Sequence, residues 1–235
     1  MTTNTDDTLV AQRPTTPGWP ELLVGAAAFA ASYALVAVFL PRIEDQAVNG
    51  VVGLVVSGLM GLVALAAASV IRIRGLAAFG FRRARRRQLA VGAALGLAAH
   101  VVGSVAAVIY TLLSGDAENV QTSYQAGAAG GVLSLLLTFI AGSIITPIGE
   151  EAFFRGVVAN VLLARYGAWV GVIVSAAIFA VAHGINPIMV VAFIVGILTA
   201  LLFRWSGSIW PGVLLHGVNN ATALLLPVVV AAVAG

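Results

Sequence analysis

Long apolar runs separated by short polar segments make up most of the chain after position 21. The runs lie at positions 22–40, 48–71, 89–113, 132–163, 168–183, 189–203 and 213–233. A helix needs about 20 mostly apolar residues to span a bilayer. The run at 132–163 is longer than one straight span and contains Pro147, so we expect a tilt, a kink or a half-helix there. The pattern predicts an all-α fold: a polytopic integral membrane helical bundle of about seven transmembrane helices, within a range of six to eight.

The segments between the runs suggest how the chain is organised. Residues 1–20 are polar, rich in threonine and interrupted by prolines, which predicts a disordered N-terminal tail. Residues 21–130 then hold the first transmembrane helices, with a basic loop at 72–88 that we expect to include an interfacial helix. A polar loop with two acids follows position 113, and residues 131–235 form the C-terminal region.

Composition explains the pattern and restricts the possible functions. Hydrophobic residues make up 60% of the 235 positions and charged residues 9%, whereas soluble domains carry about 25% charged residues. Cysteine is absent, so thiolate ligands and cysteine nucleophiles are excluded. The 12 basic residues are all arginine, and seven of them fall between Arg72 and Arg87. We interpret this cluster as a cytoplasmic loop, which predicts a cytoplasmic N-terminus and argues against nucleic-acid binding.

One charged cluster lies inside the apolar C-terminal region. Beyond position 118 the only acidic residues are Glu150 and Glu151, and Arg155 follows one helical turn after Glu151. A charge at the bilayer centre costs about 2.5–3.5 kcal/mol, so this pair requires partners, protonation or a function. Acid and base four residues apart share a helix face, which suggests that Arg155 neutralises Glu151 and leaves Glu150 facing a polar cavity. The alternative is a purely structural pairing within the bundle.

Two histidines add a second constraint. His183 follows Phe179 by one helical turn, and Asn220 follows His216 by one turn, so each pair shares a helix face. With a turn near position 166, Glu150 and His183 are sixteen and seventeen residues from it, which predicts that they lie at matching depth in antiparallel helices. The third histidine, His100, has small apolar neighbours and is interpreted as structural.

A carboxylate, two imidazoles and an amide around one buried point suit hydrolysis. The glutamate would act as general base on a water molecule, and the histidines could hold a divalent metal that lowers the pKa of that water. Catalytic zinc sites commonly combine three protein ligands with a water. The HExxH signature of soluble zinc proteases is absent, and so is the GxSxG motif of serine hydrolases.

These motifs resemble the CPBP family of intramembrane proteases, which includes CAAX prenyl endopeptidases and bacterial proteins linked to bacteriocin self-immunity. The family pattern is EExxxR, FxxxH and HxxxN, in that order on separate helices. Here the three motifs begin at Glu150, Phe179 and His216. The resemblance covers about residues 131–225 and implies a catalytic core at 131–235, buried in the membrane, in which the glutamate activates water.

By position, the resemblance assigns a role to each candidate residue. Glu150 would activate water, Glu151 and Arg155 would support the site, and His183, His216 and Asn220 would bind the metal or stabilise the oxyanion. The expected metal is Zn²⁺, with Glu150 as a further candidate ligand. The implied partners are membrane lipid and a peptide or membrane-protein substrate, and the implied location is a bacterial plasma membrane. Two alternatives stay open: a non-proteolytic scaffold or immunity protein that retains the site, and an ion-coupled transporter.

Overall fold

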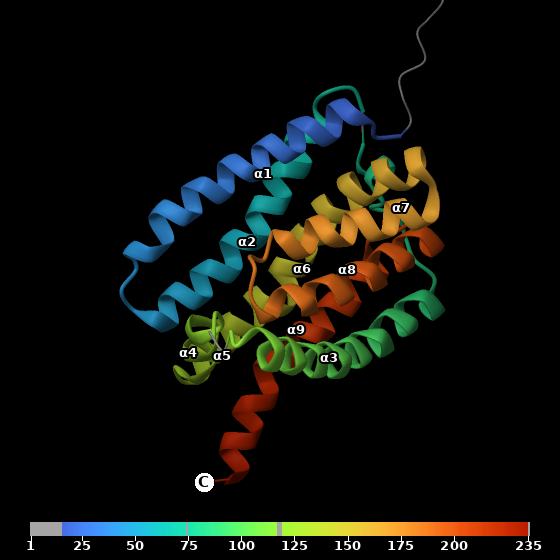
Figure 1. Cartoon of the computed structure of the whole chain (residues 1–235). Coiled ribbons are helices and arrows are strands. Elements are labelled where there is room, and N and C mark those ends of the chain that lie inside the picture. Colours follow the sequence, from blue (N-terminus) through green and yellow to red (C-terminus); the bar gives the residue numbers. More distant parts are fainter. Residues whose placement is uncertain (1–15, 74, 117–118, 235) are drawn as a thin grey trace, which may run out of the picture.

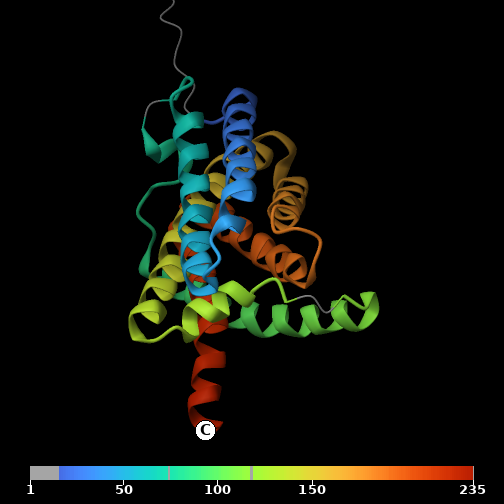
Figure 2. The ribbon, with the colours of Figure 1, turned by 90° about the vertical axis from the view of Figure 1, so that its left-hand side faces the viewer.

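The computed structural model describes residues 16–73, 75–116 and 119–234, and every regular element within these residues is a helix (Figure 1). The α-helices are α1 (Trp19–Phe39), α2 (Gln46–Ser69), α3 (Arg86–Ser114), α4 (Thr122–Ala129), α5 (Val132–Ile140), α6 (Thr146–Phe153), α7 (Asn160–Val181), α8 (Pro187–Ser206) and α9 (Trp210–Ala234). This confirms the predicted all-α bundle. The end of α9 projects beyond the other helices (Figure 2).

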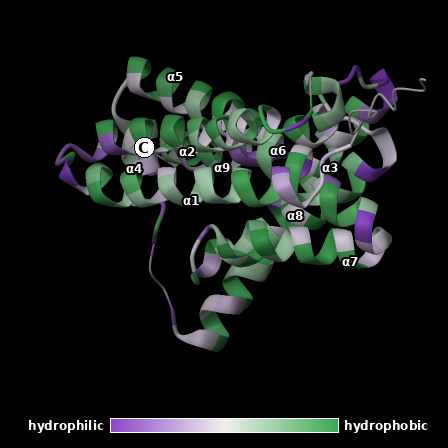
Figure 3. Ribbon diagram, turned by 90° about the horizontal axis from the view of Figure 1, so that it is seen from above, coloured by the Kyte–Doolittle hydropathy of each residue, from purple (hydrophilic) through white to green (hydrophobic). Residues whose placement is uncertain are grey.

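Among the described residues, six helical stretches are long and apolar enough to cross a membrane. One of them, Val132–Val181, is 50 residues long and includes α5, α6 and α7. The chain reverses within α7 at Gly167, whose φ of 78° is readily adopted by glycine and rarely by other residues. The two runs predicted here are therefore one helical stretch with a sharp turn. Figure 3 shows hydrophobic ribbon along the helices, as expected for an integral multi-pass membrane protein.

The beginning of α1 differs slightly from the predicted boundary. Residues 1–15 of the predicted tail lie outside the described residues, but Trp19 and Pro20 already belong to α1. Proline is well tolerated in the first helical turn because its missing N–H would have no partner there. The buried carboxylate of Glu21 accepts hydrogen bonds from Arg72 at 2.7 and 2.9 Å, which joins the start of α1 to the end of α2.

The prediction of an interfacial helix in the basic loop is wrong. The described part of this loop contains one short 3₁₀ turn, Leu76–Phe79, and α3 begins only at Arg86. Contacts with other segments hold the loop in place: Asn160 Nδ2 donates to the Ala78 carbonyl at 2.9 Å, and the Ser208 hydroxyl donates to the Arg82 carbonyl at 2.7 Å. The side chain of Phe79, in this turn, is fully buried. Tertiary contacts therefore satisfy backbone groups that a longer helix would have paired.

A short helix, α4, occupies the segment that the sequence predicts as a polar loop. It packs against α2, where the Cα of Gly50 approaches the backbone of Ser123 so closely that any Cβ would overlap it. The segment is polar and only eight residues long, so its sequence carries no amphipathic signal strong enough to predict it. Its small residues allow the close approach to α2.

The contact between α2 and α6 depends on glycine. A Cβ on Gly149 would overlap the backbone of Gly58, and a Cβ on Gly58 would lie 2.5 Å from the Ile145 carbonyl oxygen. Close backbone approach at small residues is the usual way in which membrane helices pack tightly. This contact fixes the position of the segment that carries Glu150.

We expect Gly58→Ala to destabilise the protein by about 1–3 kcal/mol, because the methyl group must displace the backbone of Ile145, directly before α6. Gly53→Ala on the same helix is the matched control: its Cβ would meet side-chain atoms at 3.4 Å, which is ordinary contact. Unfolding in mixed detergent and SDS micelles measures both changes. Equal stability of the two variants would show that the α2–α6 contact is not tight.

Candidate active site

The two adjacent glutamates lie in a helical segment with unusual geometry on both sides. Helix α6 carries Glu150 and Glu151, and π-helical turns at Ala141–Ile145 and Phe154–Ala159 flank it. A π-turn adds one residue to the helical repeat and therefore rotates the side chains that follow it. Pro147 lies in the first turn of α6, where it supplies no backbone N–H. The predicted irregularity near Pro147 thus takes the form of widened turns on either side of α6.

Glu151 and Arg155 form a buried ion pair, as the spacing predicted. Arg155 Nε lies 3.2 Å from Glu151 Oε2, and the side chains are 2% and 0% exposed. Arg155 also donates to the Gly196 carbonyl at 3.3 Å, and its guanidinium sits 4.4 Å from the centre of the Phe179 ring. Gly212 makes room for the carboxylate, since a Cβ there would lie 2.8 Å from Glu151 Oε2.

His183 lies in the turn between α7 and α8. Its Nδ1 is 2.8 Å from the Phe179 carbonyl oxygen. A carbonyl only accepts hydrogen bonds, so we assign the hydrogen to Nδ1, which leaves a lone pair on Nε2 in the neutral ring. Gly184, with φ of 80°, turns the chain after the histidine, and Asn186 caps α8. The ring is therefore fixed at the end of α7 with Nε2 facing the site.

His216 is buried on α9 and contacts both glutamates. Its Nδ1 lies 3.3 Å from Glu151 Oε1, and its Nε2 lies 3.9 Å from Glu150 Oε2. Because a carboxylate accepts hydrogen bonds, we assign a hydrogen to Nδ1 here as well. Glu151 thus links Arg155 to the imidazole and orients that ring toward Glu150.

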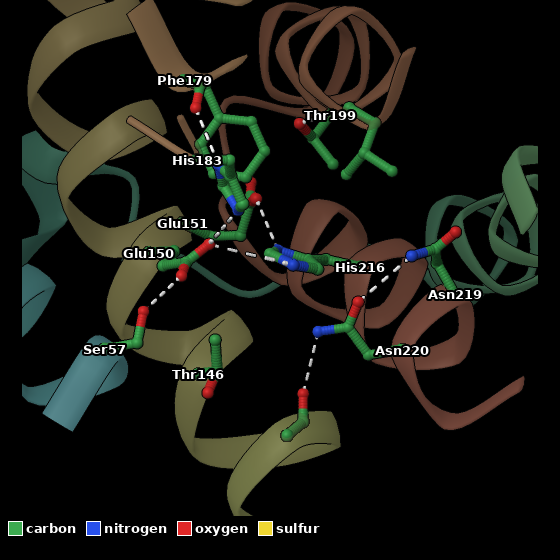
Figure 4. A network of polar contacts seen from close by, with 12 residues as sticks. Ser57, Thr146, Glu150, Glu151, Phe179, His183, Thr199, His216, Asn219 and Asn220 are labelled. Atoms are coloured by element: carbon green, nitrogen blue, oxygen red, sulfur yellow. Dashed lines mark hydrogen bonds and ion pairs between the residues drawn. The ribbon is translucent and has the colours of Figure 1, made fainter. Parts of the chain in front are cut away.

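Glu150 is the point at which the candidate residues meet (Figure 4). Its Oε2 lies 3.9 Å from His183 Nε2 and 3.9 Å from His216 Nε2. This oxygen is buried and has no hydrogen-bond partner among the described residues. The matching depth predicted for Glu150 and His183 is confirmed. A buried carboxylate oxygen without a partner, facing two imidazoles, is an acceptor that requires a donor group.

A cavity of about 710 Å³ reaches this point. Glu150, His183 and His216 line it together with mostly apolar side chains from α1, α2, α3, α8 and α9. Pockets with apolar walls and a few convergent polar groups are typical of ligand and substrate sites. The cavity is large enough to admit several residues of an extended peptide.

Asn220 lies on the cavity wall but does not join the three converging atoms. Its Nδ2 donates to the Gly142 carbonyl at 2.9 Å, and its Oδ1 accepts from Asn219 Nδ2 at 3.1 Å. The carbonyl oxygen thus accepts one hydrogen bond and keeps one lone pair. The second hydrogen on Nδ2 is free to serve another acceptor.

Several polar residues of the site or its cavity were not assigned to it from the sequence. The Ser57 hydroxyl of α2 donates to Glu150 Oε1 at 2.7 Å, and Tyr124 of α4 lines the cavity. His100, interpreted as structural, lines the cavity too. A hydroxyl in the middle of an apolar span was the available signal for Ser57, but it did not indicate which helix Ser57 faces.

A family of known proteins is similar to this chain in the region that carries Glu150, His183 and His216. Residues 132–222 match the family model described as type II CAAX prenyl endopeptidase Rce1-like. This match confirms, for these residues, the resemblance to the CPBP family. An uncharacterized 24.3 kDa protein of Escherichia coli is 33% identical over 96 residues, which cover 39% of this chain and 44% of that protein. The match therefore spans less than half of the relative. No solved structure matches the chain.

Proposed function

We propose that this chain, with its Rce1-like region at 132–222, is an intramembrane endopeptidase that hydrolyses peptide bonds in membrane-associated or lipidated peptides and proteins. The observation that carries the proposal is the unpartnered Oε2 of Glu150 between two imidazoles in the wall of a large cavity. The match to a protease family supports the same reaction class.

The gap between Glu150 Oε2 and His183 Nε2 has the size and polarity of a water site. Both atoms are acceptors in the assigned state, and a water about 2.8 Å from each can span their separation of 3.9 Å by donating to both. When the water oxygen bonds to the scissile carbonyl carbon, its proton passes to Glu150 Oε2. Glu150 then returns this proton to the leaving amine as the C–N bond breaks.

The negative charge on the substrate oxygen needs donors. Asn220 Nδ2 has one hydrogen that is not used by Gly142, and His216 supplies a second donor when its Nε2 is protonated. In this proposal Glu151 and Arg155 hold His216 in place and do not touch the substrate.

Zn²⁺, expected from the sequence, fits these atoms poorly as they are placed. Bonds of about 2.0–2.2 Å put tetrahedral neighbours of zinc about 3.3–3.6 Å apart, whereas both nitrogens lie 3.9 Å from Glu150 Oε2. No set of three His, Asp or Glu side chains among the described residues is placed to hold a metal. We therefore derive no step through a metal.

We expect peptide cleavage to change less than about twofold after treatment with EDTA, because water bound to Glu150 and His183 needs no metal. Metal analysis of the purified wild type and of the His183→Ala/His216→Ala variant is the companion measurement. Two results together would contradict this expectation and restore the metal-dependent mechanism. The wild type would contain one zinc per chain that the double variant lacks, and EDTA would abolish cleavage by the wild type.

The proposal is tested with purified protein in liposomes and three peptides of one sequence: farnesylated on a cysteine three residues from the C-terminus, the same peptide without lipid, and the same sequence joined to a transmembrane segment. Mass spectrometry identifies the cut. Cleavage of any of them by the wild type, and none by Glu150→Gln, supports an endopeptidase. A folded wild type that cuts none of the three contradicts it and favours the scaffold or immunity function.

A transporter would require a polar path across the membrane. The described cavity residues instead end at a buried layer beyond Glu150, where Arg155, Phe153 and Phe79 are at most 3% exposed. We propose a bacterial plasma membrane as the location, with the N-terminus in the cytoplasm. Hydrogen bonds join the arginine-rich loop after α2 to the turn before α9, which follows Arg204. These bonds support the placement of both basic segments at the same end of the bundle, as the positive-inside rule requires.

A further inference from the structure

The cavity occupies one half of the bundle. Most long helices contribute lining residues from the half that lies away from the turns with Arg72–Arg87, Arg165 and Arg204. Two exceptions are α9, whose lining begins in its first half at His216, and Arg42, which follows the lining residue Pro41. The lining residues fall at positions 29–41 near the end of α1, 53–60 of α2, 100–107 of α3, 179–183 at the end of α7, 188–195 of α8 and 216–227 of α9. The turns with Arg72–Arg87, Arg165 and Arg204 lie at the opposite helix ends.

A buried layer closes the cavity toward the arginine end. Beyond Glu150 along the helix, Arg155 is 1% exposed and Gly156 packs directly against the backbone of Phe79. Phe79 and Ile209 are fully buried, and Ile209 N donates to the Gly80 carbonyl at 3.0 Å. Among the described residues, these contacts separate Glu150 from the arginine end by a packed layer.

The other end of the cavity reaches the surface. Its lining includes Pro41 after α1 and Val120 and Gln121 before α4, and Val120 is 40% exposed. Arginine-rich ends of membrane helices face the cytoplasm under the positive-inside rule. The mouth of the cavity therefore faces the opposite side of the membrane.

We propose that substrate reaches Glu150 from the non-cytoplasmic side, and that this substrate is an apolar peptide segment held in or near the outer half of the bilayer. The statement that substrate uses the cavity rests on the proposed function. The direction in which the cavity opens does not depend on that function. The lining is mostly apolar, with His100, Gln121 and Gln125 as polar groups able to bond a peptide backbone. A lipidated tail on the cytoplasmic surface would meet the closed end.

The absence of cysteine makes a direct test possible, since any introduced thiol is unique. Val120→Cys reports the cavity mouth, Ala182→Cys reports the interior beside His183, and Ala77→Cys in the arginine loop is the control. Spheroplasts are treated with a membrane-impermeant maleimide before and after lysis. We expect labelling of positions 120 and 182 in intact spheroplasts and of position 77 only after lysis.

Labelling of position 182 only after lysis, or from neither side, would overturn the inference, and so would labelling of position 77 in intact spheroplasts. Catalysis enters in a separate arm: an unlipidated apolar peptide added to intact spheroplasts should be cut by the wild type and spared by Glu150→Gln. External labelling without any cleavage would refute the proposed function and leave the access route standing.

A second, independent observation concerns Ser57. Its hydroxyl donates to Glu150 Oε1 at 2.7 Å, so this oxygen is engaged and Oε2 is the one that faces the imidazoles. Ser57 precedes Gly58, whose backbone contact with α6 fixes the distance between the two helices. We infer that Ser57 is a positioning residue that selects Oε2 as the base. It lies outside the matched residues 132–222, so the N-terminal helices complete the site.

We expect Ser57→Ala to lower kcat about 10- to 100-fold with KM within about twofold, as for loss of a hydrogen bond to a charged group. Ser57→Thr, which keeps the hydroxyl, should recover most of kcat, and Ser57→Cys, a weak donor of similar size, should behave like Ala. Ser69→Ala on the same helix is the control, because its hydroxyl bonds only to its own helix.

Two results would overturn this role: kcat within twofold of wild type in Ser57→Ala, or equal loss in the Thr and Ala variants at unchanged thermal stability. Glu150→Gln is measured in the same assay. Activity that survives Glu150→Gln would refute the proposed function itself, whereas activity lost there but kept in Ser57→Ala refutes only the positioning role.

Discussion

Replacing Glu150 by glutamine is expected to lower kcat for peptide cleavage about 1,000-fold, within the range of about 100- to 10,000-fold attributed to general acid–base groups. Glutamine has nearly the same shape, and its amide oxygen can still accept the hydrogen bond from Ser57. It cannot take a proton from water. Shape and packing are therefore retained while the base is removed, so KM and the free energy of unfolding should change little.

The control is Glu44→Gln, which neutralises an exposed acid outside the cavity and should leave kcat unchanged. Cleavage rates are measured by mass spectrometry on the same peptides for all three proteins. If Glu150→Gln keeps more than about a tenth of the wild-type kcat, Glu150 is not the base. Full biological complementation by that variant would instead favour a scaffold or immunity protein.

Replacing Arg155 by methionine is expected to destabilise the protein by about 3–5 kcal/mol. The guanidinium is the charged partner of Glu151 in a site where both side chains are at most 2% exposed. Removing one member of a buried pair leaves the other charge without compensation. The variant also loses the contact with the face of Phe179, and it frees Glu151, which orients His216. Cleavage should fall together with stability.

Two further variants separate the effect of the lost charge on stability from the effect of the changed side-chain volume. Glu151→Gln/Arg155→Met removes both charges and should be less destabilised than Arg155→Met alone, because no unpaired charge remains. Arg165→Met removes an exposed arginine and should change the free energy of unfolding by less than about 0.5 kcal/mol. Unfolding in detergent and SDS micelles measures all three. A double variant less stable than the single one would show that packing, and not the ion pair, governs this site.

The sequence determined the parts of the structure that follow from local physics. Apolar run lengths predicted the spans because lipid requires each helix to satisfy its own backbone. Helical spacing predicted the Glu151–Arg155 pair, and nearly equal distances from the turn predicted that Glu150 and His183 would lie at matching depth. The free-energy cost of placing charges inside the membrane also guided the interpretation, since it must be offset by partners, protonation or a function.

Only the tertiary structure decided which groups from separate helices meet. Ser57 was one hydroxyl in an apolar span until the glycines of α2 placed it against Glu150. Asn220 shares a helix face with His216, yet its amide turns to Gly142 because a free carbonyl lies there. The described part of the basic loop forms only a short 3₁₀ turn, since distant side chains bond to its backbone. The sequence determines spacing along each helix, whereas partners across helices depend on packing, which no local pattern records.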